Sequence, residues 1–207
     1  EFASFFNEYN SEVQIVEMLP ELLPVEDDEV SSILKRSFED RGILIHTSAK
    51  VEKIEKLKTK VKVHILSNGN KSVLEAELAL VAVGVQGNVE DLNLEEFGIL
   101  IDKSWVQVNE FCQTSISNIY AIGDLIGPPW LAHVASAEGR LVAEHISGKK
   151  PNPINYSNIP GCTYCRPQVA SIGLTEKSAL DKGYELKIGR FPMKASGKAM
   201  SVGETEG

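Results

Sequence analysis

A glycine–aspartate pair and the segment after it form the part of this chain best suited to hold a cofactor. The pair is Gly123-Asp124, and it closes the short apolar run Ile119-Tyr120-Ala121-Ile122. Glycine lets a backbone approach a ligand closely, and open α/β sheets bind ligands at the carboxyl ends of their strands. A helix expected from about Leu131 adds unpaired N–H groups and a positive dipole end, which stabilise negative charge. The pattern therefore predicts a strand, a loop and a helix arranged around a cofactor.

The alternative for this pattern is a plain strand–loop–helix with an acidic residue near the helix start. Gly-Asp alone does not separate the two interpretations. The complete order of residues, from Thr114 through Asp124 and on through Leu131-Ala132-His133 to Gly139, favours the cofactor site.

The first 17 residues have the pattern of the second half of a dinucleotide-binding βαβ unit. Residues 1–10 are amphipathic and predict a helix, and residues 13–17 predict a strand that ends on Glu17. A glycine loop of this fold precedes its ribose-binding acid by roughly 20 residues, so the loop and first strand would precede Glu1. Glu17 would then accept the two ribose hydroxyls of an adenosine and repel a 2′-phosphate, which favours NAD over NADP. The alternative is a solvent-exposed glutamate at a strand end.

Further elements follow from periodicity and turn residues. Asp27 and Asp28 open a helix that ends at Gly42, and Asn68-Gly69 is a hairpin turn after an alternating strand. The continuous apolar run at 78–83 predicts a strand covered on both faces. The other predicted elements are strands at 43–45, 61–65, 78–83, 162–173 and 184–188, and helices at 131–146 and 175–182.

Composition limits the possible partners and compartments. The chain has 207 residues, a formal net charge of −8 and 43% hydrophobic residues. The acidic balance argues against nucleic acid or an anionic membrane as a partner. No apolar run is long enough to span a bilayer, and no secretory signal opens the chain. Three cysteines do not make a secreted disulfide framework, so we expect a reducing, cytoplasmic setting.

The cysteines suggest packing more than chemistry. Cys162 and Cys165 have C-x-x-C spacing, but they fall in a predicted strand, where residues three apart point to opposite faces. The sulfurs would then lie too far apart to bridge, and there is no second pair to complete a zinc site. We therefore expect no metal site and a buried structural role for both cysteines, and likewise for Cys112.

Four short segments resemble the flavoprotein disulfide reductases. The run 114–124 resembles the second FAD motif of that family, and Leu131-Ala132-His133 after it is most similar to the dihydrolipoyl dehydrogenase branch. Residues 1–6 and 16–20 resemble the family sequence that follows the NAD glycine loop. The resemblance covers nearly the whole chain and implies two cofactors, FAD and NAD.

The resemblance assigns flavin contacts to one segment. Gly123 and Asp124 would place the flavin, with the Asp124 carboxylate on a ribityl hydroxyl. The residues bordering the isoalloxazine ring would be Trp130, Leu131, Ala132 and His133, with backbone N–H groups facing the N1/O2 edge. A helix start suits that edge because the reduced flavin is anionic there. His133 is therefore expected to position the ring and not to transfer protons.

The NAD contacts implied by the resemblance lie earlier in the chain. Glu1 would lie near the nicotinamide, Glu17 would bind the adenosine ribose and Val51 would pack on adenine. Gly84 falls where the family backbone passes the nicotinamide. The family commonly has Gly-Arg-Arg-Pro-Asn there, whereas this chain has Gly-Val-Gln-Gly-Asn at 84–88, so arginine contacts are not expected.

The expected fold is α/β, with two incomplete Rossmann-like three-layer dinucleotide-binding domains and the start of an α+β interface domain. Residues 1–88 would be the rest of the NAD domain, 89–152 the returning half of the FAD domain, and 153–207 the start of the dimerisation domain. The chain has no initiator Met and no closing element, so we expect an internal piece of a longer, homodimeric protein.

The resemblance also implies the activity. The parent protein would pass electrons from dihydrolipoamide, carried by a lipoyl domain of a 2-oxo acid dehydrogenase or glycine cleavage complex, through a disulfide and FAD to NAD. The family's C-x-x-x-x-C and H-P-T-x-x-E motifs are absent here, so no catalytic residue is expected in residues 1–207. The alternatives are another member (mercuric, glutathione-like or transhydrogenase type) and a non-catalytic dinucleotide-binding module.

Overall fold

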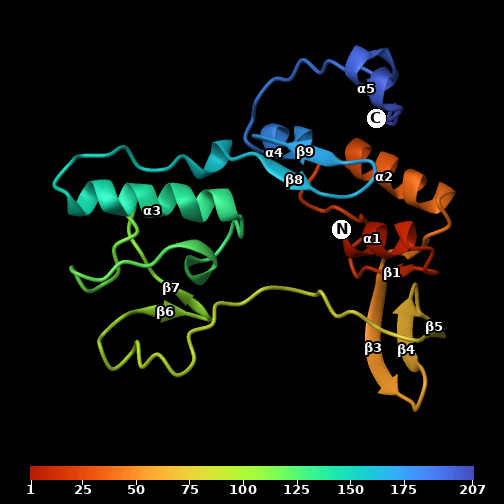
Figure 1. The fold of residues 1–207 in the computed structure, drawn as a ribbon, viewed down its shortest axis with the longest axis horizontal. Helices are drawn as coiled ribbons and strands as arrows, with labels where there is room; N and C mark the ends of the chain where they lie inside the picture. The colour runs from red at the N-terminus through yellow and green to blue at the C-terminus, as the bar shows by residue number, and fades with distance from the viewer. The chain divides into compact units, whose positions relative to one another are not determined.

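The computed structural model describes all residues from Glu1 to Gly207 and contains two compact units (Figure 1). Unit 1 combines Glu1–Leu80 with Pro160–Gly207, and unit 2 is Val81–Ile159. The predicted division at residues 88 and 152 stays a prediction. The structure has no helix long and apolar enough to cross a membrane, and its longest helix has 15 residues.

Unit 1 contains short parallel and antiparallel pairings with helices between them. Its first part consists of α1 (Phe2–Glu8), β1 (Gln14–Val16), α2 (Asp28–Asp40), β2 (Leu44–His46), β3 (Ala49–Lys56), β4 (Val61–Ser67) and β5 (Asn70–Ala76). Its second part consists of β8 (Gly161–Thr163), β9 (Val169–Ser171), α4 (Glu176–Asp181), the 3-10 turn η3 (Met193–Ala195) and α5 (Gly197–Val202). β1 and β2 are parallel and joined through α2, so this part is a βαβ connection.

Helix α2 forms because its sequence has both end signals and one apolar face. Asp27 stands at the N-cap and two further acids occupy the first turn, where the helix dipole favours negative charge. Leu34 and Phe38 are one turn apart and buried. Gly42 ends the segment with a φ of 83°, a left-handed conformation that glycine adopts readily. The predicted helix is confirmed, and its buried face forms the core of unit 1 together with Ile43, Cys165 and Val169.

The predicted hairpin is also confirmed. β4 pairs with β5 through Ser67 and Asn70, which leaves a two-residue turn, and β3 completes a three-stranded antiparallel sheet. The turn residues Asn68 and Gly69 have φ values of 50° and 77°, as a type I′ turn requires.

This turn geometry makes the substitution Gly69→Ala informative. An alanine in a left-handed conformation costs roughly 1–2 kcal/mol, so we expect the variant to unfold at a lower urea concentration. Gly189→Ala is the matched control because Gly189 has no positive φ and an added Cβ meets nothing within 4 Å. Equal unfolding midpoints for the two variants would contradict the assignment of the turn.

Unit 2 is built around one long helix and several loops. Its elements are β6 (Ile101–Asp102), β7 (Trp105–Val106), the 3-10 turn η1 (Gly123–Ile126), α3 (Ala132–Ile146) and the 3-10 turn η2 (Tyr156–Asn158). The predicted helix at 131–146 is confirmed. The core consists of Ile99, Val106 and Ala121 with partly buried apolar neighbours that include Leu125 and Ile126.

Several predicted strands are wrong because strand formation needs a pairing partner. The run 78–83 has no strand, and Leu78 and Val83 are 87% and 91% exposed (Figure 1, yellow). A strand is defined by ladder hydrogen bonds to a neighbouring strand, and no sheet of the structure includes this run. The predicted strand 184–188 fails for the same reason.

Two other strand predictions change in form. In place of the strand expected directly before Gly123, the structure has a single bridge, between Gln113 and Tyr120. The segment 162–173 is not one strand but the hairpin β8–β9, whose turn includes Pro167. A proline lacks the N–H that a continuous ladder would use. The predicted helix at 175–182 is confirmed, with the Thr175 hydroxyl accepting from the Ser178 N–H at 3.1 Å.

Candidate functional site

Glu17 lies directly after β1, at the carboxyl end of the parallel pair. Its backbone N–H donates to the His46 carbonyl at 2.9 Å, and its carbonyl accepts from the Ala49 N–H at 3.0 Å. The half-buried carboxylate accepts from the Leu19 N–H at 2.7 Å. The strand end therefore presents an anchored carboxylate, as a ribose-binding acid requires.

Val51 lies close to this strand end. It is on β3, which starts at Ala49, the residue bonded to Glu17. Val51 pairs with Ile65 across the sheet, and the register shifts between Val51 and Lys53. Its side chain is 38% exposed, so an apolar surface is available for a planar ring. The structure thus brings Val51 near Glu17 in unit 1.

The other two predicted NAD contacts lie elsewhere. Glu1 precedes α1, and its carboxylate accepts from the Tyr164 N–H at 2.8 Å. Gly84 belongs to unit 2, in an exposed segment without secondary structure, and an added Cβ there would meet nothing within 4 Å. The roles of Glu1 and Gly84 beside the nicotinamide stay predictions.

Gly123 adopts a backbone conformation that favours glycine. Its φ is 72°, its N–H donates to Glu138 Oε2 at 2.7 Å, and an added Cβ would lie 3.3 Å from the Ala135 Cβ. The positive φ and the close packing on α3 both favour glycine here. Asp124 follows in the first turn of η1, with its side chain exposed.

The start of α3 forms the other side of this segment. Leu131 is the N-cap residue and provides no side-chain cap, and the next two residues, Ala132 and His133, are exposed. Such an N-terminus presents backbone N–H groups and positive dipole charge to an anion. The Trp130 ring lies 6.1 Å from the Trp105 ring, centroid to centroid.

These residues fit a flavin dinucleotide. Gly123 allows a close backbone approach, Asp124 offers an exposed acceptor, and the N-terminus of α3 has no side-chain cap from Leu131. Trp105 Nε1 is buried without a hydrogen-bond partner, so the aromatic pair also holds an unused donor next to Trp130. All six predicted flavin contacts therefore lie on one turn and at one helix start: Gly123, Asp124, Trp130, Leu131, Ala132 and His133.

Glu138 accepts a hydrogen bond from Gly123 and another from Tyr156, and the sequence singled out neither Glu138 nor Tyr156. Glu138 is only 2% exposed and lies on the buried face of α3 between Val134 and Leu141. Its position, four residues after one apolar side chain and three before the next, is where an amphipathic helix normally has an apolar residue. A carboxylate on the apolar face of this helix was the feature of the sequence that could have identified Glu138.

The cysteine pair has no catalytic arrangement. Cys165 packs in the core of unit 1, as predicted, but it lies in the turn after β8 and not in a strand. Burial raises the pKa of its thiol, which lowers its reactivity. Cys162 is half-buried in β8, and all three cysteines are free thiols.

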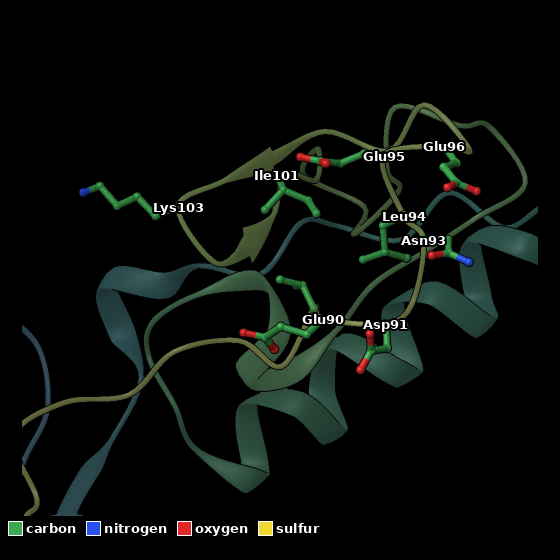
Figure 2. A pocket seen from close by; sticks show the side chains of 9 residues that line it. Glu90, Asp91, Asn93, Leu94, Glu95, Glu96, Ile101 and Lys103 are labelled. Carbon is green, nitrogen blue, oxygen red and sulfur yellow. The ribbon is translucent and has the colours of Figure 1, made fainter.

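A separate concavity in unit 2 does not coincide with the predicted contacts. It has a volume of about 340 Å³, and four of its nine lining residues are acidic: Glu90, Asp91, Glu95 and Glu96. Figure 2 shows the Lys103 side chain pointing away from these carboxylates. Their negative charge would repel the phosphates of a dinucleotide, so this concavity is not the cofactor site.

Known proteins resemble the chain along its whole length. A dihydrolipoyl dehydrogenase of Rhizobium etli is 45% identical over 210 residues, and one of Bacillus subtilis is 39% identical over 209. Both matches cover 100% of this chain, but the chain spans only 44% of the length of each relative.

Solved structures agree with the sequence relatives. A crystal structure of LpdA from Mycobacterium tuberculosis has a TM-score of 0.89 at 25% identity, covering 100% of this chain and 45% of that one. The flavoprotein disulfide reductase RclA of Escherichia coli has a TM-score of 0.89 at 27% identity, covering 100% and 47%. The α/β fold expected from the sequence, an incomplete FAD/NAD-binding fold, is confirmed.

Two family models match the chain in consecutive segments. Residues 159–207 match the pyridine nucleotide-disulphide oxidoreductase dimerisation domain. Residues 1–139 match the pyridine nucleotide-disulphide oxidoreductase model, which includes Glu17, Asp124 and the start of α3. The chain therefore belongs to the pyridine nucleotide-disulphide oxidoreductase family.

Proposed function

We propose that the complete protein is a dihydrolipoyl dehydrogenase, which oxidises dihydrolipoamide and reduces NAD by way of FAD. The observation that carries this proposal is the exposed Asp124 carboxylate in η1, close to the N-terminus of α3 in unit 2. The 45% and 39% identities to enzymes of that name support the lipoyl substrate over other disulfide substrates.

Each unit has a binding task under this proposal. In unit 2, Asp124 accepts a hydrogen bond from a ribityl hydroxyl, and the start of α3 stabilises negative charge on the ring. In unit 1, Glu17 accepts from the adenosine ribose of NAD, and Val51 packs on the adenine. The flavin, when bound, supplies two-electron redox chemistry between a dithiol and a nicotinamide.

The proposal assigns binding and not bond chemistry to residues 1–207. The C-x-x-x-x-C and H-P-T-x-x-E motifs are absent from this sequence. We propose that the dimerisation segment 159–207 makes the protein a homodimer, and that its partner is the lipoyl domain of a 2-oxo acid dehydrogenase or glycine cleavage complex. Three free thiols support a cytoplasmic location.

Steady-state rates with alternative substrates test the substrate assignment. The complete protein is expected to reduce NAD with dihydrolipoamide much faster than with reduced glutathione, and to reduce mercuric ion poorly. Efficient turnover of glutathione, mercuric ion or a second nicotinamide would replace the lipoyl assignment with another member of the family. Bound flavin without any turnover would favour a non-catalytic module.

A further inference from the structure

The Glu138 carboxylate is buried and connects three elements of unit 2. It lies on α3 with 2% exposure. Its Oε2 accepts from the Gly123 N–H of η1 at 2.7 Å, and its Oε1 accepts from the Tyr156 hydroxyl of η2 at 2.8 Å. Both oxygens are therefore engaged by donors from outside the helix.

Packing alone does not explain a carboxylate at this position. A buried charge is costly, whereas an apolar residue between Val134 and Leu141 would bury well. The cost is offset here by two hydrogen bonds to an ionised acceptor, which are stronger than neutral ones. One of the two donors belongs to the residue immediately before Asp124, so the carboxylate acts on the turn that carries the predicted flavin contact.

The surroundings keep the carboxylate in place. Burial and the hydrogen bond to Glu138 raise the pKa of Tyr156, which therefore stays a protonated donor at neutral pH. Cys112 is buried nearby, and burial followed by the Glu138 charge raises the pKa of its thiol to about 11. The Cys112 carbonyl also accepts from the Ala121 N–H at 3.0 Å, two residues before Gly123.

We propose that Glu138 is a positioning residue of the flavin site: it fixes the Gly123–Asp124 turn on α3, with Tyr156 holding its carboxylate in place. The inference rests on the proposed function, because it takes Asp124 as a flavin contact. Without the acceptor, the Gly123 N–H loses its partner and the turn no longer holds the Asp124 carboxylate at one position.

Flavin titrations of the complete protein, freed of its cofactor, test this role. Glu138→Leu removes the acceptor while filling the space, and we expect the dissociation constant for FAD to rise about 10- to 100-fold. Glu138→Gln keeps a carbonyl oxygen for the Gly123 N–H, and its amide donates to the Tyr156 oxygen, so it is expected to restore most of the affinity. Glu144→Gln, on the same helix, is the control and is expected to bind FAD like the unchanged protein.

Rescue by glutamine separates positioning from a general packing role. The KM for NAD is expected to stay unchanged in every variant, because the ribose and adenine contacts of NAD, Glu17 and Val51, are assigned to unit 1. If Glu138→Leu does not fold, Tyr156→Phe decides, with an expected affinity loss of a few-fold. Wild-type affinity in Glu138→Leu, or in Tyr156→Phe where Glu138→Leu does not fold, would overturn the inference. An unchanged protein that binds no FAD would overturn the proposed function as well.

Discussion

Asp124→Ala is expected to weaken FAD binding by the complete protein about 10- to 100-fold. The carboxylate is exposed in the first turn of η1, and the variant removes a hydrogen bond to an ionised acceptor, worth roughly 1.5–3 kcal/mol. Asp124→Asn keeps one acceptor oxygen without the charge and is expected to give an intermediate loss. The measurement is the dissociation constant for FAD from quenching of flavin fluorescence.

Asp102→Ala is the matched control for this prediction. Asp102 is an exposed carboxylate of β6 in the same unit, so its removal changes net charge equally without touching the turn. Equal FAD affinities for Asp124→Ala and Asp102→Ala would contradict the assignment of Asp124 to the flavin.

Glu17→Ala is expected to raise the KM for NAD about 10- to 100-fold while kcat changes little. The carboxylate would accept from ribose hydroxyls in both the ground state and the transition state, and loss of such uniform binding appears in KM. The variant should also lose part of its discrimination against NADP, because the negative charge that repels a 2′-phosphate is gone. Initial rates over a range of each nucleotide measure both effects.

Two further variants show whether the rise in KM comes from the Glu17 carboxylate itself or from a general change of charge. Glu17→Gln keeps an oxygen for the Leu19 N–H and removes only the charge, so it is expected to give a smaller rise in KM. Glu12→Ala, an exposed acid just before β1, should behave like the unchanged protein. A fall in kcat without a change in KM for Glu17→Ala would contradict ribose binding.

Local elements were predictable because their signals are local. The helix at Asp28–Asp40 has acids in its first turn, a spaced apolar face and Gly42 after its end, and all of these are visible in the sequence. The hairpin at Asn68-Gly69 needs two residues that accept positive φ, and the sequence supplies them. For the same reason the helix at Ala132–Ile146 was predictable, whereas the strand expected to end at Gly123-Asp124 is reduced to one bridge in the structure.

Non-local pairing could not be predicted from the same pattern. The run 78–83 has the composition of a buried strand, but a strand forms only beside a partner, and the structure gives it none. Cys165 was assigned to a strand because the turn at Pro167 was not recognised. Glu138 was missed because its importance lies in contacts with Gly123 and Tyr156, 15 and 18 residues away.

Anaerobic reduction and reoxidation of the bound flavin tests the central claim most directly. The complete protein is mixed with dihydrolipoamide in the absence of oxygen, its visible flavin absorption is recorded, and NAD is then added. The account predicts that dihydrolipoamide bleaches the flavin band and that NAD restores it while NADH forms. A protein without a flavin band, or a band that dihydrolipoamide leaves unchanged, would contradict the account.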